Sequence, residues 1–454
     1  MRKQTLLFLF CTFALHAFSQ KIWTLEECLN YAQNNNLTIK KANLNSKVSK
    51  QLLFQSKMNI LPNLNGSLSD NTNFGRNIDP VTNQITVDRI RNNNFGINST
   101  VTLFNGFQNL NTIRKNNFDY LASKYDAVKI ANDISVNIVT AYLQLLYNQD
   151  LVLVNQQKVD ISELQVQRIS KKVEVGSLPR GELLNTEAQK AQEELQLINA
   201  ENQRDIALLN LKQLLELSSE ESFEIQALKV EPSEEHKSEN IDKIYSKALA
   251  TLPQLKSSEF KMKSAERSLA IAQGGRSPRL SISASMGTAY SSASKRLVYD
   301  SLALPPTTPM YEDFPFNDQL NENLNQSISL SLSIPLFNAW MTNTTIANAK
   351  INVLQSQYSL QEAKNSIRKT VEQAHYDALA GHKKYIASKK TVDFHEESFQ
   401  YTQEKYDLQL ITTYDYNNAK NVLFRAETDL LQAKYDYIFK VKMLDFYMGE
   451  PLTF

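Results

Sequence analysis

The sequence contains little cysteine, glycine and proline, and each scarcity excludes a class of architecture. Of its two cysteines, Cys11 lies in the N-terminal apolar segment, so Cys28 alone remains for the processed chain and an intrachain disulfide is excluded. Only 11 glycines and 12 prolines occur in 454 residues, so turns must be few and the helices and strands long. The net charge of +1 argues against a nucleic-acid surface or a polybasic membrane patch.

The first 19 residues have the pattern of a secretory signal peptide. Arg2 and Lys3 precede the apolar run TLLFLFCTFAL, and Ala17-Phe18-Ser19 provides a small-x-small site for cleavage after Ser19 or Gln20. No small residues precede Cys11, which disfavours a lipid anchor. No later segment offers the roughly 18–20 consecutive apolar residues of a membrane-spanning helix. We therefore predict export from the cytoplasm.

The rest of the chain is an internal duplication. Three segments of the first half recur in the second, the last two at an offset of 233 residues. The matches are ILPNLNGSLS (60–69) with RSPRLSISAS (276–285), TVTLFNGF (100–107) with SIPLFNAW (333–340), and VEVGSLPRGELLNTE (173–187) with YDLQLITTYDYNNAK (406–420). We predict a first structural repeat over 20–217, an inter-repeat segment over 218–240 and a second repeat over 241–454.

Each repeat is expected to contain one very long helix flanked by two shorter ones. Neither glycine nor proline occurs from Phe107 to Val175, which predicts a rod of roughly 100 Å; its counterpart runs from Asn338 to about Gln409. Apolar residues recur at spacings of three and four, which favours coiled-coil-like packing. They include Val139, Tyr142, Leu146 and Leu153. The shorter helices are expected at about 24–60, 181–217, 241–275 and 414–448.

Four further segments alternate between apolar and polar residues with period two. They are about 64–70, 94–103, 280–290 and 326–336, separated by loops at 70–94 and 291–325. A barrel with lipid outside and water inside uses this pattern; a soluble sheet with one wet face is the alternative. Because four strands cannot close a barrel, the chain must oligomerise, with two copies supplying eight strands or three supplying twelve.

No enzymatic signature accompanies these elements. The chain has no GxxxxGK[ST] phosphate loop and no GxSxG nucleophile motif. His375 and His382 could share a helix face, but no cysteine or acidic partners complete a metal site. We expect a protein that is not an enzyme, with no cofactor and no metal, whose energy source lies in another protein.

The doubled layout, the LFNG and LFNA corners, VGSLPRGELLNTEAQ and the C-terminal AKYDYIFKVKMLDFYMGEPL resemble the TolC-type outer-membrane efflux family over essentially the whole processed chain. The resemblance implies a mainly α fold with a transmembrane β-barrel. It implies a homotrimer in the outer membrane of a Gram-negative bacterium, with twelve strands and a long helical tunnel across the periplasm. A periplasmic adaptor and an inner-membrane pump are the implied partners, besides outer-membrane lipid; no nucleic acid is expected.

The resemblance also implies a periplasmic gate and contact turns. Asp415 falls on the family's gate aspartate, Asn418 on a second acidic position and Tyr406 on a constriction tyrosine, while Glu182 is equivalent to Asp415 in the first repeat. A latch arginine expected near Ile411 is missing. Thr412 and Asp415 also have the spacing of a helix capping box, so gate and cap are both open. The partner-contact turns are expected at Ser177, Leu178 and Pro179, and at Leu410, Ile411 and Thr412.

Three functions are compatible with the sequence. An efflux duct for small molecules, such as drugs, is the first. The outer-membrane duct of a type I protein-secretion system is the second, and nothing in the chain separates it from the first. A periplasmic coiled-coil scaffold is the third, and it predicts no membrane strands. The exported substrate cannot be read from the sequence, because a tunnel lined by Ser, Asn and Thr recognises little itself.

Overall fold

The computed structural model describes residues 22–78, 83, 85–87, 89–218, 220, 222–227, 232, 240–299 and 309–453. The expected signal peptide, 1–19, and most of the inter-repeat segment, 218–240, lie outside these residues. Within the described chain, no helix is both long enough and apolar enough to cross a membrane.

The long helices and their C-terminal partners repeat with a constant offset. The first pair is α4 (Gln108–Glu174) and α5 (Arg180–Leu214), and the second is α9 (Met341–Asp407) and α10 (Thr413–Tyr447). Every bound of α9 and α10 lies 233 residues after the matching bound of α4 and α5. The duplication in the sequence is therefore a duplication of helical hairpins.

The two N-terminal helices expected as single elements are each divided. The first consists of α2 (Leu25–Asn35) and α3 (Leu37–Met58), and the second of α6 (Ile241–Thr251) and α7 (Pro253–Gly274). Asn36 interrupts the first, and its Oδ1 accepts a hydrogen bond from the backbone N–H of Thr38 at 2.9 Å, which starts the next helix. Pro253 starts α7 in the second, because proline is tolerated in a helix's first turn and not in its interior.

The described chain divides into two compact units, and both repeats contribute to each. One unit holds residues 47–122 and 258–359, and the other holds 1–46, 123–257 and 360–454. The first of these, which we call the strand unit, contains the main sheet. The second, the helical unit, contains both hairpin turns.

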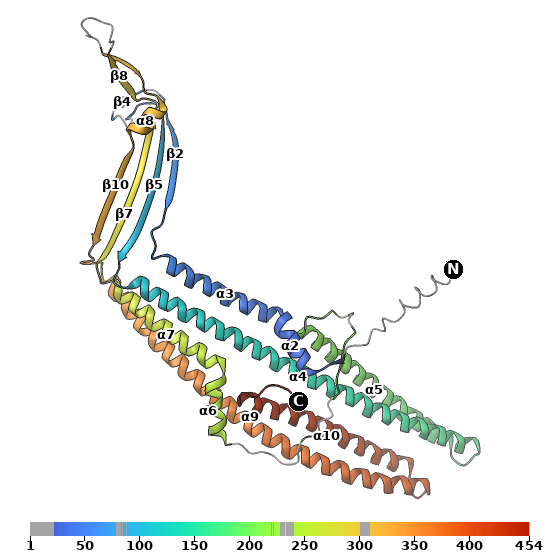
Figure 1. Cartoon of the computed structure of the whole chain (residues 1–454). Coiled ribbons are helices and arrows are strands. Elements are labelled where there is room, and N and C mark those ends of the chain that lie inside the picture. Colours follow the sequence, from blue (N-terminus) through green and yellow to red (C-terminus); the bar gives the residue numbers. More distant parts are fainter. Residues whose placement is uncertain are drawn as a thin grey trace, which may run out of the picture. The chain divides into compact units, whose positions relative to one another are not determined.

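The strand unit is built on an antiparallel sheet of four strands (Figure 1). Its order is β10 (Asn325–Ser333), β7 (Arg279–Ser291), β5 (Ile90–Phe104) and β2 (Asn65–Asn73). These strands overlap the four expected segments, with bounds shifted by up to four residues. The pairs Leu330↔Ile282 and Ile282↔Val101 place apolar side chains on one face, and Ser329↔Ser283 and Ser283↔Thr100 place hydroxyls on the other.

The two faces of the sheet differ in their contacts. On the polar face the Thr100 and Ser283 hydroxyls lie 3.1 Å apart and those of Ser285 and Ser327 lie 2.8 Å apart. On the apolar face Ile328 is 79% exposed, and other large side chains there are also open. They include Leu68, Ile97, Met286, Leu330 and Leu332. A sheet that exposes its apolar face needs an apolar environment for that face.

The corner that joins strand to long helix has the same backbone in both repeats. Gly106 and Phe107 have φ values of 64° and 60°, and the equivalent Ala339 and Trp340 have 50° and 67°. Two successive left-handed residues thus turn each chain from a strand into its helix. Gly106 is additionally required because a Cβ there would lie 2.5 Å from the Gly274 carbonyl oxygen.

The segments expected as plain loops contain regular structure of their own. In the second repeat β8 (Lys295–Tyr299) pairs with β9 (Pro309–Asp313), and α8 (Phe316–Glu322) follows. The Gln319 side chain fixes α8 on β7, because it donates to the Ser291 carbonyl at 3.0 Å and accepts from the Ser291 N–H at 2.9 Å. The first repeat holds a smaller hairpin of β3 (Asn77–Ile78) and β4 (Ile85–Thr86).

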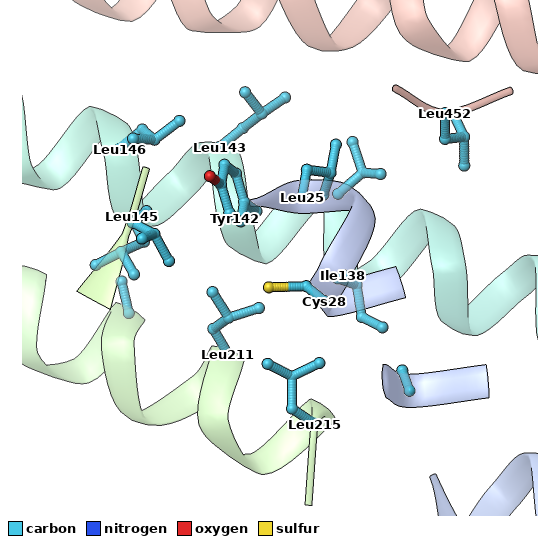
Figure 2. Packing of buried hydrophobic residues seen from close by; sticks show 14 of the residues in the cluster. Leu25, Cys28, Ile138, Tyr142, Leu143, Leu145, Leu146, Leu211, Leu215 and Leu452 are labelled. Atoms are coloured by element: carbon cyan, nitrogen blue, oxygen red, sulfur yellow. The ribbon is translucent and has the colours of Figure 1, made fainter. Parts of the chain in front are cut away.

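The helical unit encloses an apolar core around α2, α4 and α5 (Figure 2). Cys28, Ile138 and Leu211 are fully buried there. The Tyr142 hydroxyl donates to the Gln226 carbonyl at 2.9 Å, and burial raises the pKa of this phenol. Nearby, β1 (Ile22–Trp23) pairs in parallel with β6 (Glu224–Ile225), which ties the start of the described chain to the inter-repeat segment. We refer to the buried apolar side chains around Cys28, Ile138 and Leu211 as the apolar core.

One residue of the expected apolar series on α4 is placed differently. Val139, Tyr142 and Leu146 are buried as expected, but Leu153 is 61% exposed. An α-helix has 3.6 residues per turn, so a strict seven-residue series drifts around a straight helix. The buried seam of α4 continues instead through Lys158, Ser162, Gln165 and Ile169.

Candidate functional site

The first hairpin turn joins α4 to α5. Its backbone reverses at Gly176, whose φ is +76°, and the Ser177 N–H donates to the Lys172 carbonyl at 2.8 Å. This is the usual closure of a helix C-terminus by a left-handed glycine. Ser177 and Pro179 are exposed and Leu178 is half-buried. The expected contact residues of the first repeat are therefore on the turn itself.

The second turn joins α9 to α10 and has the same construction. Gln409 has φ +61°, and the Leu410 N–H donates to the Lys405 carbonyl at 2.9 Å. Thr412 is the N-cap of α10. Leu410 is 69% exposed, whereas Ile411 is half-buried. Val175 beside the first turn is also exposed. Both turns thus present an apolar side chain to solvent, as contact surfaces do.

Thr412 and Asp415 form the reciprocal capping box that their spacing predicted. The Asp415 N–H donates to the Thr412 hydroxyl at 3.2 Å, and the Thr412 N–H donates to the Asp415 carboxylate at 3.2 Å. The Thr412 side-chain and backbone hydrogen bonds lower the pKa of Asp415, so its carboxylate is ionised at neutral pH. Asp415 and Asn418 are both exposed and Glu182 is half-buried. The cap is confirmed, and the gate stays a prediction for all three.

Tyr406 is buried rather than exposed beside the turn. Its hydroxyl accepts a hydrogen bond from the Gln165 side chain at 2.6 Å and lies 3.3 Å from the Thr413 hydroxyl. Its ring stacks on Tyr416 with centroids 4.7 Å apart, and burial raises the pKa of Tyr416. The expected constriction tyrosine therefore joins α4, α9 and α10. Its role in a gate stays a prediction.

An ion pair that the sequence did not indicate also links the hairpins. Arg168 near the end of α4 lies 2.5 Å from the Asp407 carboxylate at the end of α9, and each side chain is 48% exposed. The resemblance to the family implied a latch arginine near Ile411, in the second hairpin. Arg168, which joins the two hairpins here, belongs to the first one.

A group of buried polar side chains lies further along the same helices, and we call it the polar seam. It consists of Lys158, Ser162 and Gln165 on α4, Glu193 on α5 and Lys420 on α10. Lys158 donates to the Gln196 side chain at 3.1 Å, and burial lowers its pKa. Sequence reasoning missed the seam, although one signal was available. Glu193 occupies the buried series Thr186, Glu193, Ala200 and Ala207, which is spaced by seven residues.

These features define a class of protein: one with paired long helical hairpins and an open four-stranded sheet that is apolar on one face. The chain belongs to the outer membrane efflux protein family, which matches residues 28–216 and 244–450. It is therefore a protein of the Gram-negative outer membrane that extends into the periplasm. The family and the fold are those of outer-membrane channels.

Individual relatives agree with this assignment. The chain is 24% identical over 306 residues to outer membrane protein TolC of Escherichia coli (strain K12), which is 67% of this chain and 58% of that relative's length. Its fold is similar to that of VceC of Vibrio cholerae, with a TM-score of 0.76 at 13% identity over 94% of this chain and 96% of that one. For CmeC of Campylobacter jejuni the TM-score is 0.76 at 16% identity, over 94% and 85%.

Proposed function

We propose that three copies of this chain form one export duct through the outer membrane. The observation that carries the proposal is the open sheet, apolar on one face and lined by hydroxyls on the other. Its edge strands β10 and β2 are unpaired on their outer sides within the described chain, and such edges invite pairing with another chain. Three sheets of four strands supply a twelve-stranded barrel with lipid outside and water inside.

The helical hairpins continue this duct into the periplasm as a tunnel. In this proposal the two turns form its inner end, where a periplasmic adaptor couples the duct to an inner-membrane pump. Small solutes expelled by that pump are the proposed cargo. The exposed Val175 and Leu410 support an adaptor contact at the turns, because unpartnered apolar side chains there favour a protein partner. A periplasmic scaffold has no use for the membrane sheet and is not favoured.

A ring of Asp415 carboxylates is the proposed gate. Three negative charges that converge on one axis repel one another unless cations screen them. A divalent cation should therefore reduce the conductance of the trimer in a planar bilayer. The Asp415→Asn variant should lose this block, and an unchanged block would refute the gate.

Photo-crosslinking in living cells tests the partner. A photoreactive amino acid at Val175 or Leu410 leaves both helix caps intact, and one at Tyr376, which is also exposed but lies away from the turns, is the control. Capture of the adaptor of a drug or metal pump from the turn positions alone supports efflux. Capture of an ABC-exporter adaptor would instead make the duct part of a protein-secretion system, and no periplasmic capture at either turn would contradict the proposed orientation.

A further inference from the structure

The centre of the polar seam is an ion pair closed off from solvent. The side chains of Lys420 and Glu193 are 1% and 0% exposed, and Lys420 Nζ lies 2.8 Å from Glu193 Oε1. Ser162 bridges the pair, because its hydroxyl donates to Glu193 Oε2 and accepts from Lys420 Nζ at 2.5 Å. The Gln189 side chain donates to Glu193 Oε1 at 2.8 Å. One network therefore fixes α4, α5 and α10 to one another.

Stability alone does not account for such a pair. Moving two charges out of water is costly, and well-packed apolar residues of similar volume commonly stabilise a protein as well or better. An apolar contact, however, tolerates sliding and rotation, whereas a buried ammonium has few positions in which its partners satisfy it. In some proteins a buried pair specifies one arrangement of the elements that carry it, and the register of packed helices is the best-attested case.

The duplication shows that the pair belongs to one place only. At the offset of 233 residues Lys420 corresponds to Glu187, Glu193 to Ala426, and Ser162 to His395. Glu187 is exposed and Ala426 is buried, so no second ion pair forms at the equivalent positions. The network therefore distinguishes α10, which follows the second turn, from α5, which follows the first.

Lys420 and Asp415 lie on different sides of α10. Five residues correspond to a rotation of about 140° around a helix with 3.6 residues per turn. Asp415 is exposed, while Tyr416 and Phe424, each four residues from Lys420, are buried on its side of the helix. The position of the Lys420 side chain therefore determines the direction in which Asp415 points.

We propose that Glu193, Lys420 and Ser162 position the gate by fixing the rotation of α10 against α4 and α5. This proposal rests on the proposed gate function of Asp415. Any rotation that turned Asp415 away would withdraw the Lys420 ammonium from the Glu193 carboxylate towards the apolar side chains of Leu423 and Phe424. The seven residues of α10 before Lys420, about 10 Å of helix, carry Asp415. They are held against α9 as well, because Tyr416 stacks on Tyr406.

A cysteine reporter tests the rotation of α10 directly. Asn418 is exposed, lies about 60° from Asp415 around the helix and does not take part in the capping box, and the native Cys28 is fully buried. Asn418→Cys in the assembled trimer is treated with a short bismaleimide. If three copies of α10 converge as proposed, neighbouring copies become crosslinked.

The test variant combines Glu193→Leu with Lys420→Met, so that no charge is left buried alone and the trimer can still assemble. We expect the crosslinking yield of Asn418→Cys to fall several-fold in this background and the closed-state conductance to rise, while the amount of trimer in the membrane is unchanged. The single variant Lys420→Arg retains Glu193 and keeps both charges of the pair, so its crosslinking yield should stay close to that of the native trimer. The control removes Lys440 and Asp436, an ion pair within α10 alone, and should leave the yield unchanged.

Two outcomes overturn the proposal, and they are distinguishable. An undiminished yield and conductance in the Glu193→Leu/Lys420→Met trimer would show that the pair does not position α10, with the gate itself unaffected. Absence of crosslinking in the otherwise native trimer would show that the second turns do not converge, and the gate would fail together with the proposal that rests on it.

Discussion

The apolar core and the polar seam are two stretches of the same helices packed by different means. On α4, Ile138, Tyr142 and Leu145 enter the apolar core, and some turns later Ser162 and Gln165 enter the polar seam. Both sets follow the same spacing of three and four residues. The contact geometry of the helices is thus shared, and only the chemistry of the contact changes towards the turns.

Because of this difference, the apolar core and the polar seam constrain the helices in different ways. Burial of apolar surface is non-directional and proportional to area, so the apolar core holds the helices together without selecting one rotation. Hydrogen-bonded charges stabilise only the arrangement in which each is satisfied. The proposed gate needs a defined orientation of α10, which the polar seam can supply, whereas the apolar core supplies firm packing.

The largest loss of stability is expected when the polar seam loses one of its two paired charges. Lys420→Met leaves Glu193 buried without a counter-ion, which costs about 3–5 kcal/mol. The thermal midpoint of the helical circular dichroism signal of the trimer should fall accordingly. Lys440→Met is the matched control, because its partner Asp436 lies on the same helix and both are partly exposed. Equal midpoints for the two variants would show that burial of the pair has no energetic consequence.

A substitution in the apolar core should lower the stability of the trimer by a similar amount but should leave the proposed gate unchanged. Leu211 is fully buried, and Leu211→Ala leaves a cavity that costs about 2–5 kcal/mol. Because the cavity removes no directional contact of α10, the crosslinking yield of the Asn418→Cys reporter should stay at its native level. A yield that fell with Leu211→Ala would mean that any loss of stability turns α10, and the distinction between the two regions would be lost.

The sequence was sufficient to predict the parts of the fold that depend on local pattern. The scarcity of glycine and proline predicted the long helices, the period of two predicted the sheet faces, and Thr412 with Asp415 predicted a helix cap. The divisions at Asn36 and Pro253 could have been predicted from the same rules, since both residue types start helices.

The polar seam could not be predicted in the same way. Spacing identifies the face of a helix but not the helix that it will contact, and Glu193 and Lys420 are 227 residues apart in the chain. A charged residue in a heptad series is ordinarily read as a solvated position. Only the placement of α5, α4 and α10 side by side shows that Glu193 has a partner. Leu153 illustrates the converse, an apolar residue in a heptad series that drifts to the surface.

A smaller effect is expected for the ion pair at the surface. Arg168 and Asp407 connect α4 with α9 much as Glu193 and Lys420 connect α5 with α10, but both are about half-exposed. Solvent screens such pairs, and they contribute about 0–1 kcal/mol. A double-mutant cycle of Arg168→Ala and Asp407→Asn, read by thermal midpoint, measures the coupling. A coupling as large as that of the buried pair would show that solvent exposure does not separate the two.

The smallest effect concerns pH, because Asp415 is exposed and its pKa is lowered from 3.8 by the Thr412 contacts. A carboxylate whose folded pKa is depressed contributes its stability above the unfolded value and loses it only as pH falls through the folded value. Between about pH 5 and 7.5 Asp415 should therefore stay ionised. Divalent block of the trimer, measured at constant cation concentration, should not change across this range. A block that weakened towards pH 5 would contradict this expectation. It would mean that the three converging carboxylates raise one another's pKa by more than the Thr412 contacts lower it. The carboxylates would then lie closer together than the capping geometry alone implies.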